Sequence, residues 1–152
     1  MAKMAELKPA NVLLVEDNED DIELTLEALE DSKVRMEIHV VSDGISAMAF
    51  LHREGEYANK PRPDLILLDL NLPLMDGRET LKKIKGDPTL ADIPVVVLTT
   101  SVDEGDILNA YQQHANCYIS KPVDFSKFTE IIKQIGGFWF QLVKLPRQGN
   151  LR

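Results

Sequence analysis

The polar side chains best suited to metal or phosphoryl chemistry stand just after short apolar runs of the chain. They are Glu16, Asp17, Asp69, Asn71, Thr99 and Lys121. Asp69 follows four consecutive apolar residues, so its carboxylate should be substantially buried. An acidic residue after a strand is often only a helix cap, and a single threonine or lysine means little. The signal therefore lies in the whole set and not in any one member.

If these side chains meet, the carboxylates of Glu16, Asp17 and Asp69 repel one another unless positive charge joins them. Lys121 supplies one positive charge, which leaves about two negative charges to be balanced. Mg²⁺ suits such a site, because it prefers oxygen ligands, needs few from the protein and keeps several waters. The backbone carbonyl of Asn71 can add a neutral ligand. We therefore expect Mg²⁺ to bind here.

A magnesium ion and a lysine beside a carboxylate favour phosphoryl transfer to Asp69, because they neutralise charge on the transferring oxygens. The resulting acyl phosphate adds roughly one further negative charge, and its oxygens need new partners. Thr99 carries the nearest hydroxyl on the neighbouring strand. The expected chemistry is therefore phosphorylation of Asp69 with Lys121 and Thr99 beside it.

Five short apolar runs alternate with longer amphipathic stretches, which predicts βαβ units and a mostly parallel sheet. The runs are Val12–Val15, Met36–Val41, Leu65–Leu68, Val95–Leu98 and Cys117–Ser120. The first, third and fourth are continuously apolar and should be central, whereas the second and fifth include polar residues and should be edge strands. This pattern fits an α/β, flavodoxin-like doubly wound (βα)5 fold with strand order 2-1-3-4-5. Because the strands are parallel, the polar residues that follow them converge at one edge of the sheet.

The stretches between the runs carry apolar residues three or four positions apart, as amphipathic helices do. The spacing predicts helices around Ile22–Leu29, Ala47–Leu51, Leu81–Ile84, Ile107–Tyr111 and Phe125–Ile135. Asp43 and Asp124 can each be a helix N-cap, and Asp76 with Glu79 has the spacing of a capping box.

The composition favours one globular domain, with 152 residues, 44% hydrophobic and 28% charged. A net charge of −8 argues against a nucleic-acid-binding surface and against attraction to an anionic membrane. No run approaches the roughly 20 apolar residues that span a bilayer, and no signal peptide is apparent, so we expect a cytoplasmic protein. The single cysteine cannot form an internal disulfide, and the three histidines are scattered without metal-ligand spacing.

In these positions the residues resemble the response regulator receiver domains of two-component signalling. The matching segments are Val12–Asn18, Leu65–Pro73, Asp76–Gly77, Ile93–Thr99 and Tyr118–Pro122. The resemblance runs from about Asn11 to Gln134. More narrowly, four further segments are similar to the phytochrome-associated response regulators of cyanobacteria, namely Gly55–Tyr57, Pro61–Pro63, Thr99–Ser101 and the tail Phe138–Pro146.

The resemblance implies a role for each matching residue of the site. It assigns Asp69 as the phosphoacceptor, and Glu16 and Asp17 as the acidic pair that holds Mg²⁺ together with the Asn71 backbone carbonyl. It also assigns Lys121 as the lysine that contacts the phosphoryl group. Glu16 stands where many members have Asp, which could place one metal contact through water.

The resemblance further implies that Thr99 and Tyr118 form a switch pair. Thr99 would move toward the phosphoryl group and Tyr118 would turn inward behind it. The face expected to respond comprises the fourth helix, the fifth strand and the fifth helix. The implied phosphodonor is a sensor histidine kinase, here a phytochrome.

We expect an N-terminal arm at residues 1–10, a receiver domain at residues 11–135 and an apolar C-terminal extension at residues 136–152, with no output domain. The extension is rich in large apolar residues, namely Phe138, Trp139, Phe140, Leu142, Val143 and Leu145. Such residues tend to mark interfaces, so we expect homodimerisation beside the fifth helix. The alternative is that the extension folds back on its own core.

Three function classes stay open at this point. The first is a stand-alone regulator that binds an output partner when phosphorylated, and the second is a phosphorelay intermediate that passes the group to another histidine protein. The third is an enzyme such as an aspartyl-phosphate hydrolase or a flavin protein. Such hydrolases need a general acid two residues after the nucleophile, where this chain has Asn71. Glycine-rich nucleotide-binding motifs are also absent, so the enzyme class is the weakest.

Overall fold

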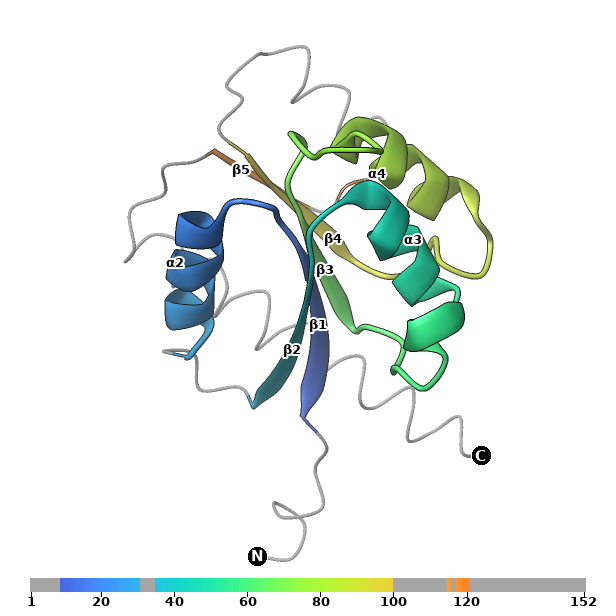
Figure 1. The fold of residues 1–152 in the computed structure, drawn as a ribbon, viewed down its shortest axis with the longest axis horizontal. Coiled ribbons are helices and arrows are strands. Elements are labelled where there is room, and N and C mark those ends of the chain that lie inside the picture. The colour runs from blue at the N-terminus through green and yellow to red at the C-terminus, as the bar shows by residue number, and fades with distance from the viewer. Residues whose placement is uncertain (1–8, 31–34, 100–114, 116, 121–152) are drawn as a thin grey trace, which may run out of the picture.

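A parallel five-stranded sheet forms the centre of the molecule (Figure 1). The computed structural model describes residues 9–30, 35–99, 115 and 117–120, without the side chains of residues 99 and 117–120. The strands are β1 (Ala10–Val15), β2 (Met36–Val41), β3 (Leu65–Leu68), β4 (Val95–Thr99) and β5 (Cys117–Ser120). Their order is β2-β1-β3-β4-β5. The predicted fold class, the strand order and the choice of central and edge strands are therefore confirmed.

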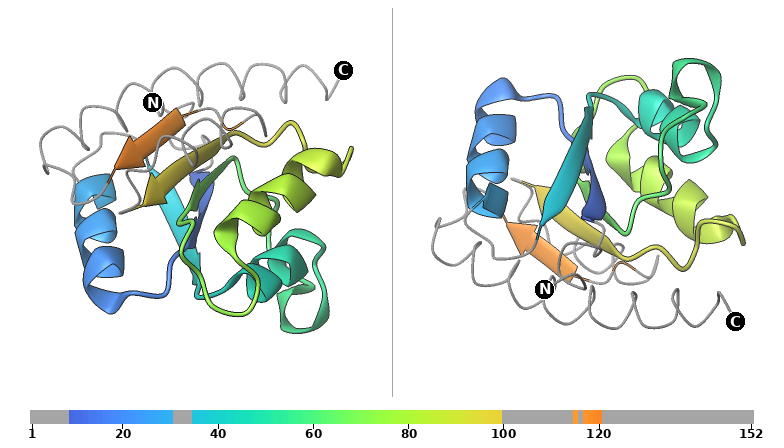
Figure 2. Two further views of the ribbon diagram at one scale, coloured as in Figure 1. Left: turned by 90° about the horizontal axis from the view of Figure 1, so that it is seen from above. Right: turned by 90° about the horizontal axis from the view of Figure 1, so that it is seen from below.

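The described helices cover both faces of this sheet. They are α2 (Glu19–Glu30), α3 (Gly44–Leu51) and α4 (Gly77–Gly86), with a short 3-10 turn, η1, at Gly55–Tyr57. Figure 2 shows α2 on one face and α3 with α4 on the other. These are the first three predicted helices. The two predicted around residues 107–111 and 125–135 lie outside the described residues.

The alternation of side chains along β3 explains why its sequence is apolar without interruption. Leu65 and Leu67 pack in the core layer on the side of α2, whereas Ile66 and Leu68 pack in the layer that also contains residues of α3 and α4. All four are at most 1% exposed. A strand buried on both faces has no position for a polar residue, so the first polar side chain after it, Asp69, marks where the strand ends.

Local capping fixes the starts of α3 and α4. The carboxylate of Asp43 accepts a hydrogen bond from the Ser46 N–H at 2.6 Å, as its predicted N-cap role requires. The carboxylate of Asp76 accepts one from the Arg78 N–H at 2.7 Å. The cap on α4 therefore uses the second helical N–H and not that of Glu79, the partner expected from capping-box spacing.

Gly77 lets the first turn of α4 press directly against the chain that leaves β3. A Cβ atom built at Gly77 would lie 2.2 Å from the backbone oxygen of Asp69 and 2.5 Å from the Cα of Leu70. The Gly77 N–H also donates a hydrogen bond to the Leu70 carbonyl at 2.9 Å. Any side chain here would therefore displace the segment that carries Asp69.

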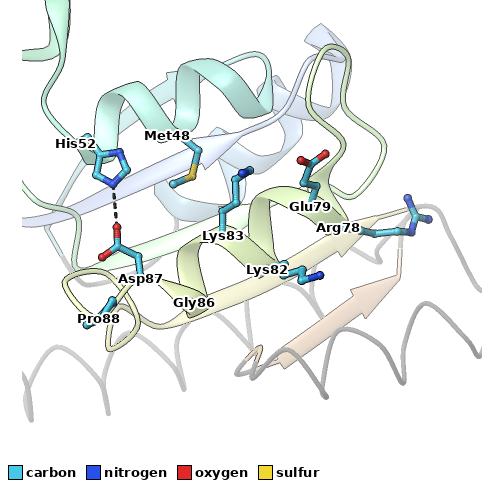
Figure 3. A pocket seen from close by; sticks show the side chains of 9 residues that line it. All are labelled: Met48, His52, Arg78, Glu79, Lys82, Lys83, Gly86, Asp87 and Pro88. Atoms are coloured by element: carbon cyan, nitrogen blue, oxygen red, sulfur yellow. Dashed lines mark hydrogen bonds and ion pairs between the residues drawn. The ribbon is translucent and has the colours of Figure 1, made fainter.

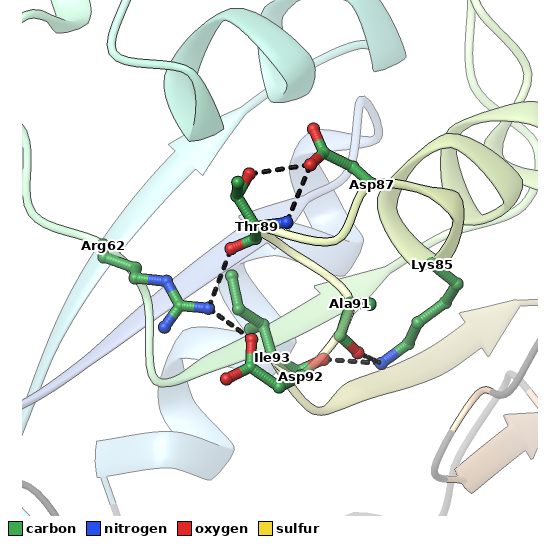
Figure 4. Close-up of polar contacts among 7 residues, drawn as sticks. All are labelled: Arg62, Lys85, Asp87, Thr89, Ala91, Asp92 and Ile93. Atoms are coloured by element: carbon green, nitrogen blue, oxygen red, sulfur yellow. Dashed lines mark hydrogen bonds and ion pairs between the residues drawn. The ribbon is translucent and has the colours of Figure 1, made fainter.

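Polar contacts join the segment between α4 and β4 to Lys85 of α4 and to Arg62, at the end of the sheet opposite to Asp69 (Figure 4). The half-buried ammonium of Lys85 donates hydrogen bonds to the carbonyls of Ala91 at 2.9 Å and Ile93 at 2.7 Å. Burial lowers the pKa of Lys85 from its ordinary value, an effect that nearby Asp92 opposes. Arg62, which precedes β3, forms an ion pair with Asp92 at 2.6 Å.

His52 and Asp87 join the ends of α3 and α4. The His52 ring and the Asp87 carboxylate lie 2.9 Å apart, at one end of a groove between the two helices that also contains Met48 and Lys83 (Figure 3). The hydrogen bond from His52, with those from the Thr89 hydroxyl and N–H, lowers the pKa of Asp87 to about 2.

None of the helices in the described part of the chain is long and apolar enough to cross a bilayer.

The close approach at Gly77 predicts that Gly77→Ala destabilises the protein by roughly 2–3 kcal/mol, because backbone atoms must shift to admit the methyl group. Gly86→Ala is the matched control in the same helix, since a Cβ there meets nothing within 4 Å. It should stabilise the protein by about 0.5 kcal/mol through a less flexible unfolded chain. Urea unfolding of both variants measures this. A Gly77→Ala variant as stable as the parent would contradict the prediction.

The His52–Asp87 contact predicts a pH effect with a definite sign. Folding lowers the pKa of Asp87 from 3.8 to about 2, so Asp87 favours the folded state above pH 3.8. That contribution is lost as the pH falls through about 2. In His52→Ala the pKa of Asp87 should rise toward 3.8, because the hydrogen bond from His52 is lost. The midpoint of the Asp87 titration, followed by NMR of its carboxyl carbon, measures this. Arg62→Gln removes a neighbouring ion pair without touching Asp87, and it should leave the midpoint unchanged.

Candidate metal and phosphoryl site

The register of the sheet places Glu16 and Asp69 side by side. Val15 at the end of β1 is opposite Leu68 at the end of β3. The residues that follow them, Glu16 and Asp69, are therefore neighbours across the two chain segments. The Asp69 N–H donates to the Val15 carbonyl at 3.0 Å, which continues the pairing one step past the strands. The Glu16 N–H donates to the Val41 carbonyl of β2, also at 3.0 Å. Backbone pairing therefore fixes both residues.

Glu16, Asp17 and Asp69 form a carboxylate cluster at this edge of the sheet. One oxygen from each residue lies within 4.8 Å of the others. Glu16 is 1% exposed and Asp69 is 5% exposed, whereas Asp17 is exposed. The cluster thus has two recessed members and one at the surface.

Backbone N–H groups orient the two buried carboxylates. Asn18 N–H donates to Oε2 of Glu16 at 3.2 Å, and Asn71 N–H donates to Oδ1 of Asp69 at 3.3 Å. The side-chain oxygen of Asn18 in turn accepts the Asp21 N–H at 2.9 Å, in the first turn of α2. The loops that follow β1 and β3 thus orient the carboxylates of Glu16 and Asp69.

The geometry brings three carboxylates together, two of which are shielded from water. Two unit charges 4.8 Å apart repel by roughly 3 kcal/mol at the effective dielectric constant of a protein site. Oxygen atoms at this spacing can share one divalent cation, and carboxylates are the ligands that Mg²⁺ prefers. The residues of the cluster therefore fit a hard divalent metal in number, type and spacing.

The structure describes the other predicted site residues only in part. Asn71 is exposed, two residues after Asp69. The backbone of Thr99 ends β4 and pairs with Ser120, and the backbone of Tyr118 in β5 pairs with Val97. The side chains of Thr99 and Tyr118, and the whole of Lys121, lie outside the described residues.

Sequence reasoning gave no role to Asn18, Gly77 or Leu74. Asn18 and Gly77 make close contacts at this edge of the sheet, and Leu74 lies in the loop that follows Asp69. Asn18 precedes an acidic first helical turn, which is a recognisable N-cap signal. Gly77 follows an N-cap aspartate, and a glycine at the start of a helix could have indicated that another backbone segment approaches closely there. Leu74 has a φ of +68°, and nothing in its residue type announces that conformation.

The groove of Figure 3 is separate from the carboxylate cluster. It lies between α3 and α4 and is lined by His52, Lys82 and Lys83 among others, but by no member of the cluster. The chemistry that the sequence predicts therefore belongs to the sheet edge and not to this groove.

Comparison with known proteins agrees with this geometry. The response regulator receiver domain family matches residues 12–133. Response regulator Rcp1 of Synechocystis sp. is 49% identical over 138 residues, which cover 91% of this chain and 94% of Rcp1. The probable methanogenesis regulatory protein FilR2 of Methanothrix harundinacea is 39% identical and is covered over 88% of its length.

Solved structures give the same assignment. The phosphorylated cyanobacterial phytochrome response regulator RcpA is 56% identical with a TM-score of 0.79, over 88% of this chain and 95% of RcpA. The Mn²⁺-bound form of Rcp1 has a TM-score of 0.78 over 86% of this chain and 94% of that one. The resemblance to phytochrome-associated response regulators is thereby confirmed. The chain belongs to the response regulator receiver domains of two-component systems, which are signalling proteins and not classical enzymes.

Proposed function

We propose that the protein acts as a response regulator that accepts a phosphoryl group on Asp69 and changes conformation in response. The observation that carries the proposal is the carboxylate cluster, in which a buried Asp69 at the end of β3 meets Glu16 and Asp17 within 4.8 Å. That a related protein, RcpA, was solved in a phosphorylated form supports it.

In the proposed reaction a carboxylate oxygen of Asp69 attacks the phosphorus of the donor. A phosphorus–oxygen bond to Asp69 forms as the donor's bond to phosphorus breaks, and the bonding pair leaves with the donor. Hydrolysis of the acyl phosphate later returns the carboxylate and releases phosphate. The Asn71 N–H keeps Oδ1 of Asp69 in a fixed orientation, which favours attack. Lys121 is proposed to contact the transferring oxygens.

Glu16, Asp17, Asp69 and the Asn71 backbone carbonyl are proposed to hold Mg²⁺. When bound, the ion would neutralise charge on the phosphoryl oxygens and offset the repulsion within the cluster. That the related Rcp1 was solved in a Mn²⁺-bound form supports the proposal that this chain binds a divalent metal.

Switching is proposed to depend on Thr99 and Tyr118. New contacts from the phosphoryl group to Thr99 and Lys121 would exist only in the active state, and such differential contacts shift the balance between two states. A shift from mostly inactive to mostly active needs about 5.5 kcal/mol of differential stabilisation.

The proposed phosphodonor is a sensor histidine kinase, in particular a phytochrome, because receiver domains take phosphoryl groups from histidine kinases and RcpA is a phytochrome response regulator. Homodimerisation through the fifth helix and the C-terminal extension stays a prediction, since both lie outside the described residues. A cytoplasmic location likewise stays a prediction.

Incubation with acetyl phosphate and Mg²⁺ should add one phosphoryl group to the chain, detected by mass spectrometry of the intact protein. Asp69→Asn should abolish the addition. Asp76→Asn, which alters an exposed acid on the same loop, should retain it. Equal labelling of Asp69→Asn and the parent would refute the assignment of the acceptor.

The cluster also predicts the residues that determine metal affinity. Glu16→Gln and Asp17→Asn should each weaken Mg²⁺ binding by on the order of tenfold, because each removes a charged oxygen ligand. Isothermal titration calorimetry measures the affinity. Asp20→Asn is the matched control, since it removes an exposed acid of the same segment that is not in the cluster. A comparable loss in Asp20→Asn would mean that the ion responds to diffuse surface charge.

A further inference from the structure

The groove between α3 and α4 carries positive charge on a chain that has an excess of acids. Helix α4 (Gly77–Gly86) contains four basic residues and one acid, whereas the whole chain has a net charge of −8. Lys82 and Lys83 line the groove, and both are exposed. Figure 3 shows Lys83 extending from α4 toward α3. The groove therefore presents two ammonium groups to solvent.

The acids that line the groove do not neutralise these lysines. The carboxylate of Asp87 is held by the ring of His52 at 2.9 Å. Among the residues that the structure describes, neither Glu79 nor any other acid forms an ion pair with Lys82 or Lys83. Both lysines can therefore pair with carboxylates of another molecule.

The shape of the groove suits a segment of polypeptide. The groove is open to solvent and has a volume of about 960 Å³, at the upper end of the range for small-molecule pockets. Met48 of α3 gives it a half-buried apolar wall, and methionine adapts its shape to varied partners. Grooves between helices commonly receive an amphipathic segment. Such a segment can place an apolar side chain against Met48 and its acids beside the lysines.

An acidic helix of this chain has matching charge, but the geometry argues against a second copy as the occupant. Helix α2 carries six acids and no basic residue. It covers the face of the sheet opposite to α3 and α4 (Figure 2), so a contact between α2 of one copy and the groove of the next would be head-to-tail. Such contacts produce open chains unless a rotation closes them, and copies with a charge of −8 repel one another. A different protein is therefore the favoured occupant.

We propose that the groove between α3 and α4 is a docking site for a partner protein that inserts an acidic segment with an apolar anchor residue. Lys82 and Lys83 pair with the carboxylates of the segment, and Met48 contacts the anchor. Complementary charges of this kind steer association and select the partner. The groove contains no member of the carboxylate cluster, so the inference adds a contact surface and does not depend on phosphorylation of Asp69.

The test measures binding of a defined peptide to the full chain by fluorescence anisotropy. The probe is a fluorescein-labelled peptide in which glutamates and leucines alternate at helical spacing. Replacing both lysines, Lys82→Gln with Lys83→Gln, should weaken binding about tenfold, as expected for the loss of two exposed ion pairs. Lys60→Gln is the matched control, because it removes an exposed lysine that does not line the groove. It should leave the affinity within about twofold of the parent.

A neutral substitution separates occupation of the groove from diffuse attraction. Gly86 lines the groove, and a Cβ there meets nothing within 4 Å, so Gly86→Trp should obstruct the groove without a clash in the fold. It should weaken binding by at least about tenfold, while thermal unfolding shows the stability of the parent. A peptide with lysines in place of the glutamates should not bind. A peptide of glutamates alone should bind more weakly than the probe, because it has no apolar anchor.

Failure of the probe to bind, or equal binding by the parent and either groove variant, would overturn the inference. An equal loss in Lys60→Gln would do so too, because it would assign the attraction to overall charge. Displacement of the probe by inorganic phosphate as readily as by unlabelled peptide would indicate a small-anion site instead. Self-association in analytical ultracentrifugation that the double lysine variant abolishes would identify a second copy as the occupant. Either of these last two results would also overturn the inference.

Discussion

The fixed proximity of the Glu16 and Asp69 carboxylates is the constraint on which the rest of the site depends. Two like charges would separate if their backbones could move. They cannot, because β1 and β3 pair in a register that places Val15 opposite Leu68, and both strands are buried on both faces. The apolar core thus supplies the free energy that holds these acidic groups close together, in an arrangement that a divalent cation could stabilise.

The strands, their order and the meeting of Glu16, Asp17 and Asp69 could all be predicted from the sequence, because each follows from local pattern and parallel topology. Continuous apolar runs reveal strands buried on both faces, and the first polar residue after each run lies at the edge. Gly77 and Leu74 could not be assigned in this way. Their importance depends on which backbone approaches them and on a φ angle imposed by the folded loop, and neither is encoded in residue type alone.

The two ends of the sheet use similar residues for different purposes. Beyond the carboxyl ends of the strands, Asp69 joins two other acids in a cluster that fits a divalent cation. Before the amino ends, Asp87 and Asp92 each have a basic partner, His52 and Arg62 respectively. An aspartate there stabilises connections between elements. Topological position, more than residue identity, therefore separates the acids that gather into a cluster from those that pair with basic residues.

The two anchored ends of α4 have a mechanical consequence. At its start, Gly77 is seated against the Asp69 backbone, and at its end Lys85 and the Asp87–His52 pair bind the following segment and α3. A helix that is attached at both ends cannot easily shift or tilt as a rigid body. A displacement of the Asp69 backbone would therefore meet resistance along α4, because contacts at both ends of this helix hold it against neighbouring segments.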